Sequence, residues 1–185
     1  MIPPSDRQAI AGDWVRFSWD LASASCDQVV VPPGFDVRNV SQSDRDAVLQ
    51  VVIEAYASEP VWAGVIDAIS NRMRTRIAET IDRDGVEYVG IFRGNELVAV
   101  SGVAREHWTD QHLLTGICVI PRTQRCGIGT FLLGYSLQRL RALGVKVARV
   151  YTEAGSLADV KIYPLFGSRR EPGVSYPGAT QLLRR

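Results

Sequence analysis

The sequence lacks any run of about 18 apolar residues, the length that a helix needs to cross a bilayer. Its beginning, MIPPSDRQAIAGDW, also lacks the charged start and apolar core of a signal peptide. It has only three cysteines, Cys26, Cys118 and Cys126, and their spacing fits neither a disulfide framework nor a zinc site with paired thiolates. These absences predict a cytoplasmic protein with no membrane partner and no metal site.

The sequence also has little net charge, because 21 basic residues are matched by 20 acidic ones and the formal net charge is +1. A protein that binds nucleic acid would more often show a concentrated basic excess. The closest runs are NRMRTR at residues 71–76 and QLLRR at residues 181–185, and we interpret both as solvated faces. We therefore expect no nucleic-acid partner.

The 185 residues are enough for one domain that buries its own core. No internal repeat or low-complexity tract divides the chain. Residues 1–33 are predicted to be an N-terminal extension of uncertain structure, in which WVRFSWDLA favours a strand, and residues 34–185 to be the main domain. The order of helical and strand patterns in the main domain predicts the α/β (α+β) class.

Two amphipathic helices are predicted near the start of that domain. Ser43 can cap the first, with Asp46 three residues later. The apolar face of this helix consists of Val48, Val51, Val52 and Ala55. In the second helix, apolar residues recur every three or four positions opposite a basic face. These residues are Trp62, Val65, Ile66, Ile69, Met73 and Ile77.

Strand patterns follow. The turn RGNE between EYVGIF and LVAVSGVARE indicates a hairpin, because glycine and asparagine readily adopt positive φ. The segment HLLTGICVI, residues 112–120, is nearly all apolar and predicts a central strand covered on both faces. A helix from Thr130 that stops at Gly144 and another buried strand in VKVARVYTE complete the pattern.

The stretch VIPRTQRCGIGTFLLG, residues 119–134, places two glycines between a strand and a helix. Gly127 and Gly129 have no Cβ, so their amides can approach a ligand closely. The first turn of the following helix would add unpaired N–H groups and the positive end of its dipole. The turn is therefore predicted to bind a phosphate group.

Two common phosphate motifs do not fit this turn. A nucleotide P-loop needs a lysine and a hydroxyl residue after its last glycine, whereas Gly127 is followed by Ile128 and Gly129 by Thr130. A dinucleotide-binding fingerprint needs a third glycine where Leu132 stands, and it belongs to the first strand–helix unit of a chain. A turn that only allows tight packing of strand on helix stays open as an alternative.

The segment QRCGIG, residues 124–129, resembles motif A of the GCN5-related N-acetyltransferase (GNAT) superfamily, which is Gln or Arg, two residues, Gly, any residue, then Gly or Ala. The strand VARVYTE and the segment IYPLFGSRRE also follow the family's order, so the resemblance covers about residues 34–171. It implies the GNAT fold, a central, mostly antiparallel mixed sheet flanked by helices and splayed around the cofactor. It also implies acetyl-coenzyme A (acetyl-CoA) as co-substrate.

The resemblance implies where acetyl-CoA binds. Backbone amides of the turn would hold its pyrophosphate, and the splayed strand would expose backbone groups to the pantetheine arm. One N–H of that strand could stabilise the oxyanion of acyl transfer. The implied cofactor-binding residues are Ile117, Cys118, Val119, Gln124, Arg125, Cys126, Gly127, Ile128, Gly129 and Thr130.

The family's tyrosine general acid corresponds to Tyr163 in KIYPLFG, which becomes the predicted catalytic residue. The alternative is a tyrosine that only packs its ring. The chain departs from the family pattern here, because TEAGS lacks an asparagine and Pro164 disfavours a helical backbone at Tyr163. A short helix capped by Ser156, with Asp159 three residues later, should therefore end or kink near Tyr163.

No residue of the sequence is a clear general base. The positions at which some relatives carry a glutamate are Leu113, Thr115 and Ile117, and none of these side chains accepts a proton. The remaining candidates are Glu106, His107, Asp110 and His112 near the end of the hairpin, and Glu54 and Glu59 near the junction of the first two helices. Tyr56 and Trp62 lie at the same junction. They could line an acceptor pocket, or they could complete the core instead.

Two thiols have both a chemical and a structural interpretation. Cys118 could form an acyl-enzyme, although its apolar strand favours core packing. Cys126 lies near a helix N-terminus, where a thiol can become reactive.

The sequence therefore predicts an N-acetyltransferase that moves an acetyl group from acetyl-CoA to a primary amine by direct attack. The acceptor stays open among small molecules, peptide N-termini and lysine side chains. The competing hypothesis is a non-catalytic acyl-CoA-binding module that acts as a sensor or interaction domain. The strand-like N-terminal extension could dock on a second copy of the chain, which would give a homodimer.

Overall fold

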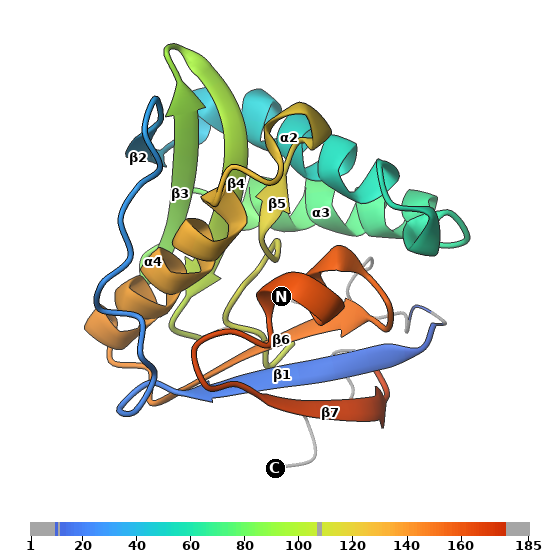
Figure 1. The fold of residues 1–185 in the computed structure, drawn as a ribbon. Helices are drawn as coiled ribbons and strands as arrows, with labels where there is room; N and C mark the ends of the chain where they lie inside the picture. Colours follow the sequence, from blue (N-terminus) through green and yellow to red (C-terminus); the bar gives the residue numbers. More distant parts are fainter. Residues whose placement is uncertain (1–9, 11, 107–108, 177–185) are drawn as a thin grey trace.

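The computed structural model describes residue 10, residues 12–106 and residues 109–176. These residues form two sheets with helices around them (Figure 1). The strands are β1 (Trp14–Asp20), β2 (Asp36–Val40), β3 (Val86–Arg93), β4 (Glu96–Ala104), β5 (Cys118–Val119), β6 (Val147–Glu153) and β7 (Arg169–Val174). The helices are α2 (Arg45–Ala57), α3 (Ile66–Thr80) and α4 (Ile128–Ala142), with short helical turns η1 (Gln42–Asp44), η2 (Pro60–Trp62), η3 (Pro121–Thr123) and η4 (Ala158–Ile162).

The first sheet has the strand order β2-β3-β4-β5, and each pair is antiparallel. Its centre is the predicted hairpin of β3 and β4, in which Gly94 has a φ of +59°. That turn conformation is easy for glycine and confirms the hairpin.

The strand predicted at residues 112–120 is shorter than expected. Within residues 112–120, only β5 and the isolated bridge between Leu113 and Val103 pair with β4. The interruption is at Gly116, whose φ is +72°, and at Thr115, whose hydroxyl replaces a backbone group by accepting the Gly102 N–H at 2.9 Å. The expectation of a continuous central strand is therefore wrong, because a bulge turns the chain away from the sheet.

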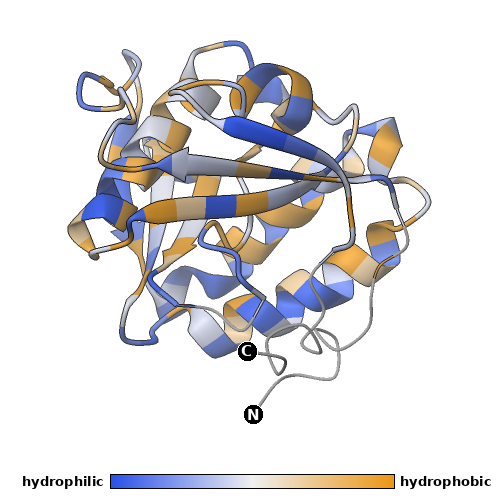
Figure 2. Ribbon diagram, turned by 90° about the horizontal axis from the view of Figure 1, so that it is seen from below, coloured by the Kyte–Doolittle hydropathy of each residue, from blue (hydrophilic) through white to orange (hydrophobic). Residues whose placement is uncertain are grey.

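The second sheet has the order β6-β1-β7, again antiparallel, with β1 in the middle. Figure 2, which views this part of the molecule from below, shows apolar and polar colours alternating along the middle of this sheet, whereas β7 begins with three charged residues, Arg169, Arg170 and Glu171. In β1 the buried residues Val15, Phe17 and Trp19 alternate with Arg16 and Ser18. The strand expected in the N-terminal extension is confirmed. The division of the chain at residue 34 stays a prediction, but β1 completes a sheet whose other strands come from the second half of the chain.

Helices cover both faces of the first sheet: α2 and α3 lie on one side and α4 on the other (Figure 1). The predicted apolar face of the first helix, Val48, Val51, Val52 and Ala55, is the buried face of α2. The α+β class with antiparallel sheets flanked by helices is thus confirmed. Among the residues that the structure describes, no helix is long and apolar enough to span a bilayer.

The expectation of a solvated basic face on NRMRTR is wrong for two of its arginines. Arg72 is 1% exposed and Arg76 is 0% exposed, whereas Arg74 lies on the surface. Arg76 donates to the Leu114 carbonyl at 2.7 Å, so the segment between β4 and β5 draws it inward. Trp62 belongs to η2, so α3 begins later than predicted. The QLLRR run lies outside the described residues.

Candidate active site

The turn between β5 and α4 presents a row of backbone amides. The Gln124 side chain donates to the Val119 carbonyl at 3.1 Å, which ties the turn to the end of the strand. The first backbone hydrogen bond of the helix runs from the Phe131 N–H to the Gly127 carbonyl. Within the described chain, the N–H groups of residues 125–130 have no acceptor. Such a row at a helix N-terminus can bind an anion.

Two glycines keep this row accessible. Gly127 has a φ of +80°. Arg125 in the same turn has a φ of +60°, a backbone conformation that residues other than glycine rarely adopt. A Cβ on Gly129 would lie 3.0 Å from Cδ1 of Ile162 and 4.0 Å from Cγ2 of Ile117. The bare backbone at Gly129 therefore lets the start of α4 pack closely against the Ile162 side chain.

Next to the turn, the two sheets separate. β5 pairs with β4, whereas β6 pairs with β1, so no ladder joins β5 to β6 in the described residues. Ile117 is half-buried here, and Cys118 and Val119 are buried. The Cys118 thiol donates to the Thr115 carbonyl at 3.3 Å, and burial raises the pKa of this thiol, so that it stays protonated. These contacts favour core packing over an acyl-enzyme role. Cys126, by contrast, is exposed on the turn.

Tyr163 lies where the two sheets separate. Its hydroxyl accepts the Ile117 N–H at 3.3 Å and would lie 2.8 Å from a Cβ on Gly116. Its ring packs against Phe17 and Trp19, and the residue is only 2% exposed. Burial raises the pKa of the phenol, so the hydroxyl stays protonated at neutral pH.

The segment that carries Tyr163 is held by the predicted cap. The Ser156 hydroxyl accepts the Asp159 N–H at 3.1 Å, and the Asp159 carboxylate accepts the Gly155 N–H at 2.9 Å. Arg170 on β7 donates to both carboxylate oxygens of Asp159, at 2.7 and 2.9 Å. η4 is thereby fixed to the second sheet.

The helical turn ends at Ile162, as Pro164 predicts. Tyr163 nevertheless keeps helical backbone angles, φ −67° and ψ −22°, so the expected departure from a helical backbone is wrong. The reason lies in the wide turn of η4, in which the Tyr163 N–H reaches the Ala158 carbonyl five residues earlier at 2.8 Å. The chain after Tyr163 then leaves the helix, where a proline is tolerated.

Most of the candidate bases are engaged elsewhere. Asp110 and Glu54 form ion pairs with arginines at 3.0 and 3.2 Å, and Nδ1 of His112 accepts a backbone N–H at 3.1 Å. Glu106 is exposed, and His107 lies outside the described residues. No three His, Cys, Asp or Glu side chains of the described chain are grouped to hold a metal ion.

Glu59 is the candidate base that lies near Tyr163. One of its oxygens accepts the Leu157 N–H at 2.7 Å, which links η2 to the start of the η4 segment. Partial burial raises the pKa of Glu59, and this effect outweighs the lowering by the Leu157 N–H and by the Trp62 side chain. The Glu59 charge in turn raises the pKa of the Cys118 thiol and the Tyr163 phenol, after the larger effect of their burial. The carboxylate therefore acts on the same region as Tyr163.

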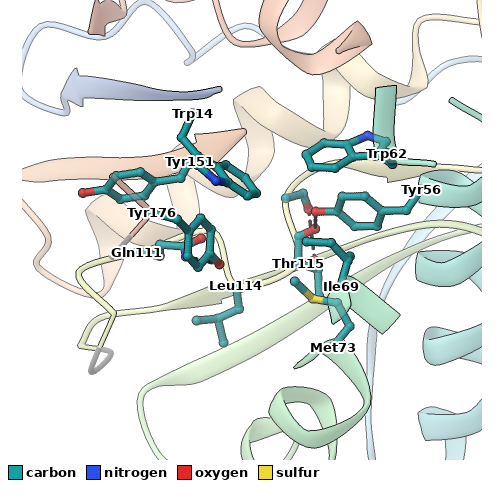
Figure 3. Close-up of a pocket in the computed structure, with 11 residues that line it drawn as sticks. Trp14, Tyr56, Trp62, Ile69, Met73, Gln111, Leu114, Thr115, Tyr151 and Tyr176 are labelled. Carbon is teal, nitrogen blue, oxygen red and sulfur yellow. Dashed lines mark hydrogen bonds between the residues drawn. The ribbon is translucent and has the colours of Figure 1, made fainter. Parts of the chain in front are cut away.

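A small pocket lies between the second sheet and helices α2 and α3 (Figure 3). Its lining residues, called the aromatic pocket below, are Trp14, Tyr56, Trp62, Ile69, Met73, Gln111, Leu114, Thr115, Gly116, Tyr151 and Tyr176. In Figure 3, Trp14, Tyr151 and Tyr176 lie on one side, and Tyr56, Trp62, Ile69 and Met73 on the other. The free volume is about 10 Å³, which is room for about one water molecule.

Tyr56 and Trp62 both line this pocket and pack in the core. Their rings meet edge to face at 4.9 Å, and the Tyr56 hydroxyl donates to the Thr115 carbonyl at 2.9 Å. Sequence reasoning missed Trp14, Tyr151 and Tyr176. The period-two pattern of β6 could have placed Tyr151 on a face, but no local pattern brings Trp14 and Tyr176 to the same pocket.

The comparisons with known proteins agree with this geometry. A GCN5-related N-acetyltransferase from Sphaerobacter thermophilus superposes with a TM-score of 0.59 at 16% identity, over 89% of this chain and 50% of that one. One from Kribbella flavida gives a TM-score of 0.53 at 15% identity, over 91% and 57% of the two chains. The chain thus spans little more than half the length of these structures, which at such low identity show a shared fold alone.

No curated protein sequence matches the chain. The sequence model of the acetyltransferase (GNAT) family, however, matches residues 51–167, which include β3 to β6, the amide turn and Tyr163. This match extends over more than half of the chain, and the fold is the one that the GNAT structures share. The chain therefore belongs to the GNAT family of acetyltransferases.

Proposed function

We propose that this protein transfers an acetyl group from acetyl-CoA to a primary amine, by direct attack of the amine on the thioester. The observation that carries the proposal is the row of N–H groups at residues 125–130, which have no acceptor among the described residues and lie next to the point where the two sheets separate. These donors, with the positive end of the α4 dipole, suit a pyrophosphate without any lysine.

In this proposal the amides of residues 125–130 bind the pyrophosphate, while the Gln124 N–H donates to the Pro121 carbonyl at 3.2 Å. The backbone of residues 117–119 contacts the pantetheine arm. The close contact at Gly129 supports this arrangement, because a side chain there would press on Ile162 and displace the first turn of α4, whose amides bind the pyrophosphate. The bond between Gln124 and Val119 keeps the turn and the strand end in a fixed relation. Acetyl-CoA would supply the activated acetyl group.

Tyr163 is proposed as the general acid for the departing thiolate. Its hydroxyl oxygen accepts the Ile117 N–H, which leaves the phenolic proton available for a second partner. Because burial raises the pKa of this phenol, the proton is present at every pH at which the enzyme would work. The ring contacts with Phe17 and Trp19 hold the hydroxyl toward β5.

Calorimetry with coenzyme A tests the binding site. We expect the wild-type chain to bind coenzyme A and Gly129→Leu to bind it at least about tenfold more weakly, because the new side chain would press on Ile162 and displace the amides of the first turn of α4. Gly64→Leu is the matched control, since no atom lies within 4 Å of a Cβ at Gly64. Absence of binding by the folded wild-type chain, or equal binding by Gly129→Leu, would contradict the proposed site.

A non-catalytic acyl-CoA-binding module is the second candidate. The observation that favours it is the Ile117 N–H, which is one of the strand N–H groups predicted to stabilise the oxyanion but donates to the Tyr163 hydroxyl. Release of free thiol from acetyl-CoA in the presence of a panel of amines separates the two functions. Turnover with any amine rules out the module, whereas tight binding without turnover supports it.

A further inference from the structure

We propose that the aromatic pocket is the acceptor site, that its acceptor is a primary amine on an uncharged aromatic body, and that Glu59 takes the proton of that amine. The inference rests on the proposed function and deepens it. It names the class of substrate and the proton acceptor, and neither follows from the amide turn.

The walls of the pocket determine the class of acceptor. They are five aromatic rings with three aliphatic or thioether side chains, and the polar lining consists of uncharged groups such as Gln111 and Thr115. The rings meet at several angles: Trp14 lies 5.9 Å from Trp62 and 4.4 Å from Tyr176, both tilted. Faces and edges are thus both presented, which suits a flat aromatic body through stacked and edge-to-face contacts.

Positive charge behind one wall disfavours an acceptor with several charges. The Arg72 guanidinium lies 4.5 Å over the Tyr176 ring, and Arg76 donates to the Tyr176 hydroxyl at 3.5 Å. Burial alone would raise the pKa of Tyr176, but these arginines outweigh it and lower the pKa. Because that field reaches a lining residue, a second ammonium group in the pocket would be repelled.

The pocket lies between the proposed acid and Glu59. Gly116 is part of its lining, and a Cβ on Gly116 would lie 2.8 Å from the Tyr163 hydroxyl. Trp62 is another part of the lining, and its backbone N–H donates to the Glu59 carbonyl at 3.1 Å, which places the two residues side by side. An amine held among these rings would therefore have a proton acceptor near Trp62 and a proton donor near Gly116.

The step balances with these two residues. The ammonium gives one proton to Glu59, and the nitrogen lone pair then forms the C–N bond to the thioester carbonyl carbon. When the C–S bond breaks, the sulfur takes the phenolic proton of Tyr163, and the second proton lost by the nitrogen restores the phenol. Glu59 releases its proton to water. The raised pKa of Glu59 makes it a stronger base, while the facing Cys118 and Tyr163 stay protonated.

Acceptor binding requires the rings to move apart, because the free volume is about 10 Å³. Trp62 is on η2, a turn of three residues between α2 and α3, and is joined to the rest of the pocket by ring contacts with Trp14 and Tyr56. We therefore expect the tryptophan fluorescence of the chain to change when 2-phenylethylamine, which does not itself fluoresce in this range, is added with coenzyme A.

A comparison of four amines tests the class of acceptor. With acetyl-CoA at saturation, we expect kcat/KM for 2-phenylethylamine and tryptamine to exceed that for putrescine and spermidine by at least about tenfold. Equal or higher values for the two polyamines would overturn the inference and leave the proposed function standing. Absence of turnover with any amine would contradict the proposed function and this inference together.

Glu59→Gln tests the proton acceptor, with Glu54→Gln as the matched control on the same side of the fold. We expect Glu59→Gln to lower kcat/KM for 2-phenylethylamine by about 10²-fold or more and to remove the acidic limb of the pH profile that Glu59 causes. Coenzyme A affinity should stay unchanged, and Glu54→Gln should behave like the wild type. A wild-type pH profile in Glu59→Gln would overturn the assignment.

A second variant keeps the assignment testable if Glu59→Gln unfolds, because Glu59 also holds the Leu157 N–H. Glu59→Asp keeps a carboxylate on a shorter side chain, and we expect it to retain the acidic limb with a reduced kcat. A Glu59→Asp variant that folds, binds coenzyme A and shows no acidic limb would equally overturn the role of Glu59.

Discussion

The Tyr163 hydroxyl is a single polar group at the point where the two sheets separate. Its oxygen binds the Ile117 N–H, its ring lies against β1, and its helical turn is anchored to β7. The same contacts that bury it also keep its proton in place, since burial raises the pKa of the phenol. One residue therefore combines a structural and a proposed catalytic role, and the two can be separated by removing the oxygen alone.

Tyr163→Phe should lower kcat by about 10-fold to 100-fold, because the thiolate loses its acid while the ring contacts remain. The loss stays moderate because a thiol with a pKa of about 8.5 is a tolerable leaving group. Thiol release from acetyl-CoA measures the rate, and calorimetry checks that coenzyme A affinity is retained. Tyr135→Phe on α4 is the control. A Tyr163→Phe variant with the wild-type rate at every pH would remove Tyr163 from the mechanism.

Cys118→Ala should keep kcat within about threefold of the wild type, because the thiol is buried, protonated and bonded to a carbonyl. The free energy of unfolding of this variant should fall by about 1 kcal/mol, because removal of the sulfur leaves a small cavity. Urea unfolding and thiol release measure the two effects. A loss of activity without a loss of stability would instead support the acyl-enzyme role considered for Cys118.

Among secondary-structure elements, η4 is held in place by one charged pair. Asp159 on η4 is 4% exposed at its side chain and bonds Arg170 of β7 through both oxygens. The bonds from Arg170 lower the pKa of Asp159 below its ordinary value of 3.8. The contribution to stability is therefore complete above that ordinary value and disappears as the pH falls through the lower, folded-state pKa.

Asp159→Asn should reduce the free energy of unfolding at pH 7 by about 1–2 kcal/mol, a figure kept small because Arg170 is 42% exposed and water screens the pair. The variant should also lose less stability than the wild type when the pH is lowered below 3.8. Urea unfolding between pH 7 and pH 2 measures both. Glu79→Gln, on the exposed side of α3, should change neither.

Elements whose apolar residues or turn residues follow a regular local spacing could be predicted from the sequence. Features that depend on contacts between distant parts of the chain could not. The buried face of α2 and the hairpin of β3 and β4 follow from helical spacing and from a Gly-Asn turn. The bulge at Gly116 and the burial of Arg72 and Arg76 depend on the segment between β4 and β5, which folds against α3. The sequence around an arginine in a helix does not indicate whether a distant backbone carbonyl will accept its hydrogen bond.

The same distinction holds for the site. The amide turn was predictable, because its glycines and the following helix are contiguous in the sequence. The aromatic pocket was not, since Trp14 and Tyr176 are brought together only by the pairing of β1 with β7. Glu59 was one of several candidates, and what distinguishes it is a hydrogen bond to Leu157, 98 residues further along the chain.

For the whole molecule, the position of β1 determines whether the second sheet can exist. β1 pairs with β6 on one side and β7 on the other, and its side chains Val15, Phe17 and Trp19 are fully buried. Without β1, these two strands would lose their common partner and Tyr163 would lose two ring contacts.

A chain of residues 34–185, cut at the domain boundary that the sequence predicts, should therefore fail to fold cooperatively. Removal of three large buried side chains costs several kcal/mol, which approaches the whole stability of a typical domain. Thermal unfolding followed by circular dichroism compares this chain with residues 1–185. A cooperative transition in the shorter chain, together with coenzyme A binding, would show that the N-terminal extension is separable.

The central place of β1 also has a consequence for synthesis on the ribosome. The strands of the first sheet lie within residues 36–119, so that sheet can assemble while the polypeptide is still growing. β1 must wait, because its partners β6 and β7 end only at Glu153 and Val174. During that interval we expect its tryptophans to lack their native contacts, and the large sequence separation between the paired strands predicts that this sheet closes late in folding.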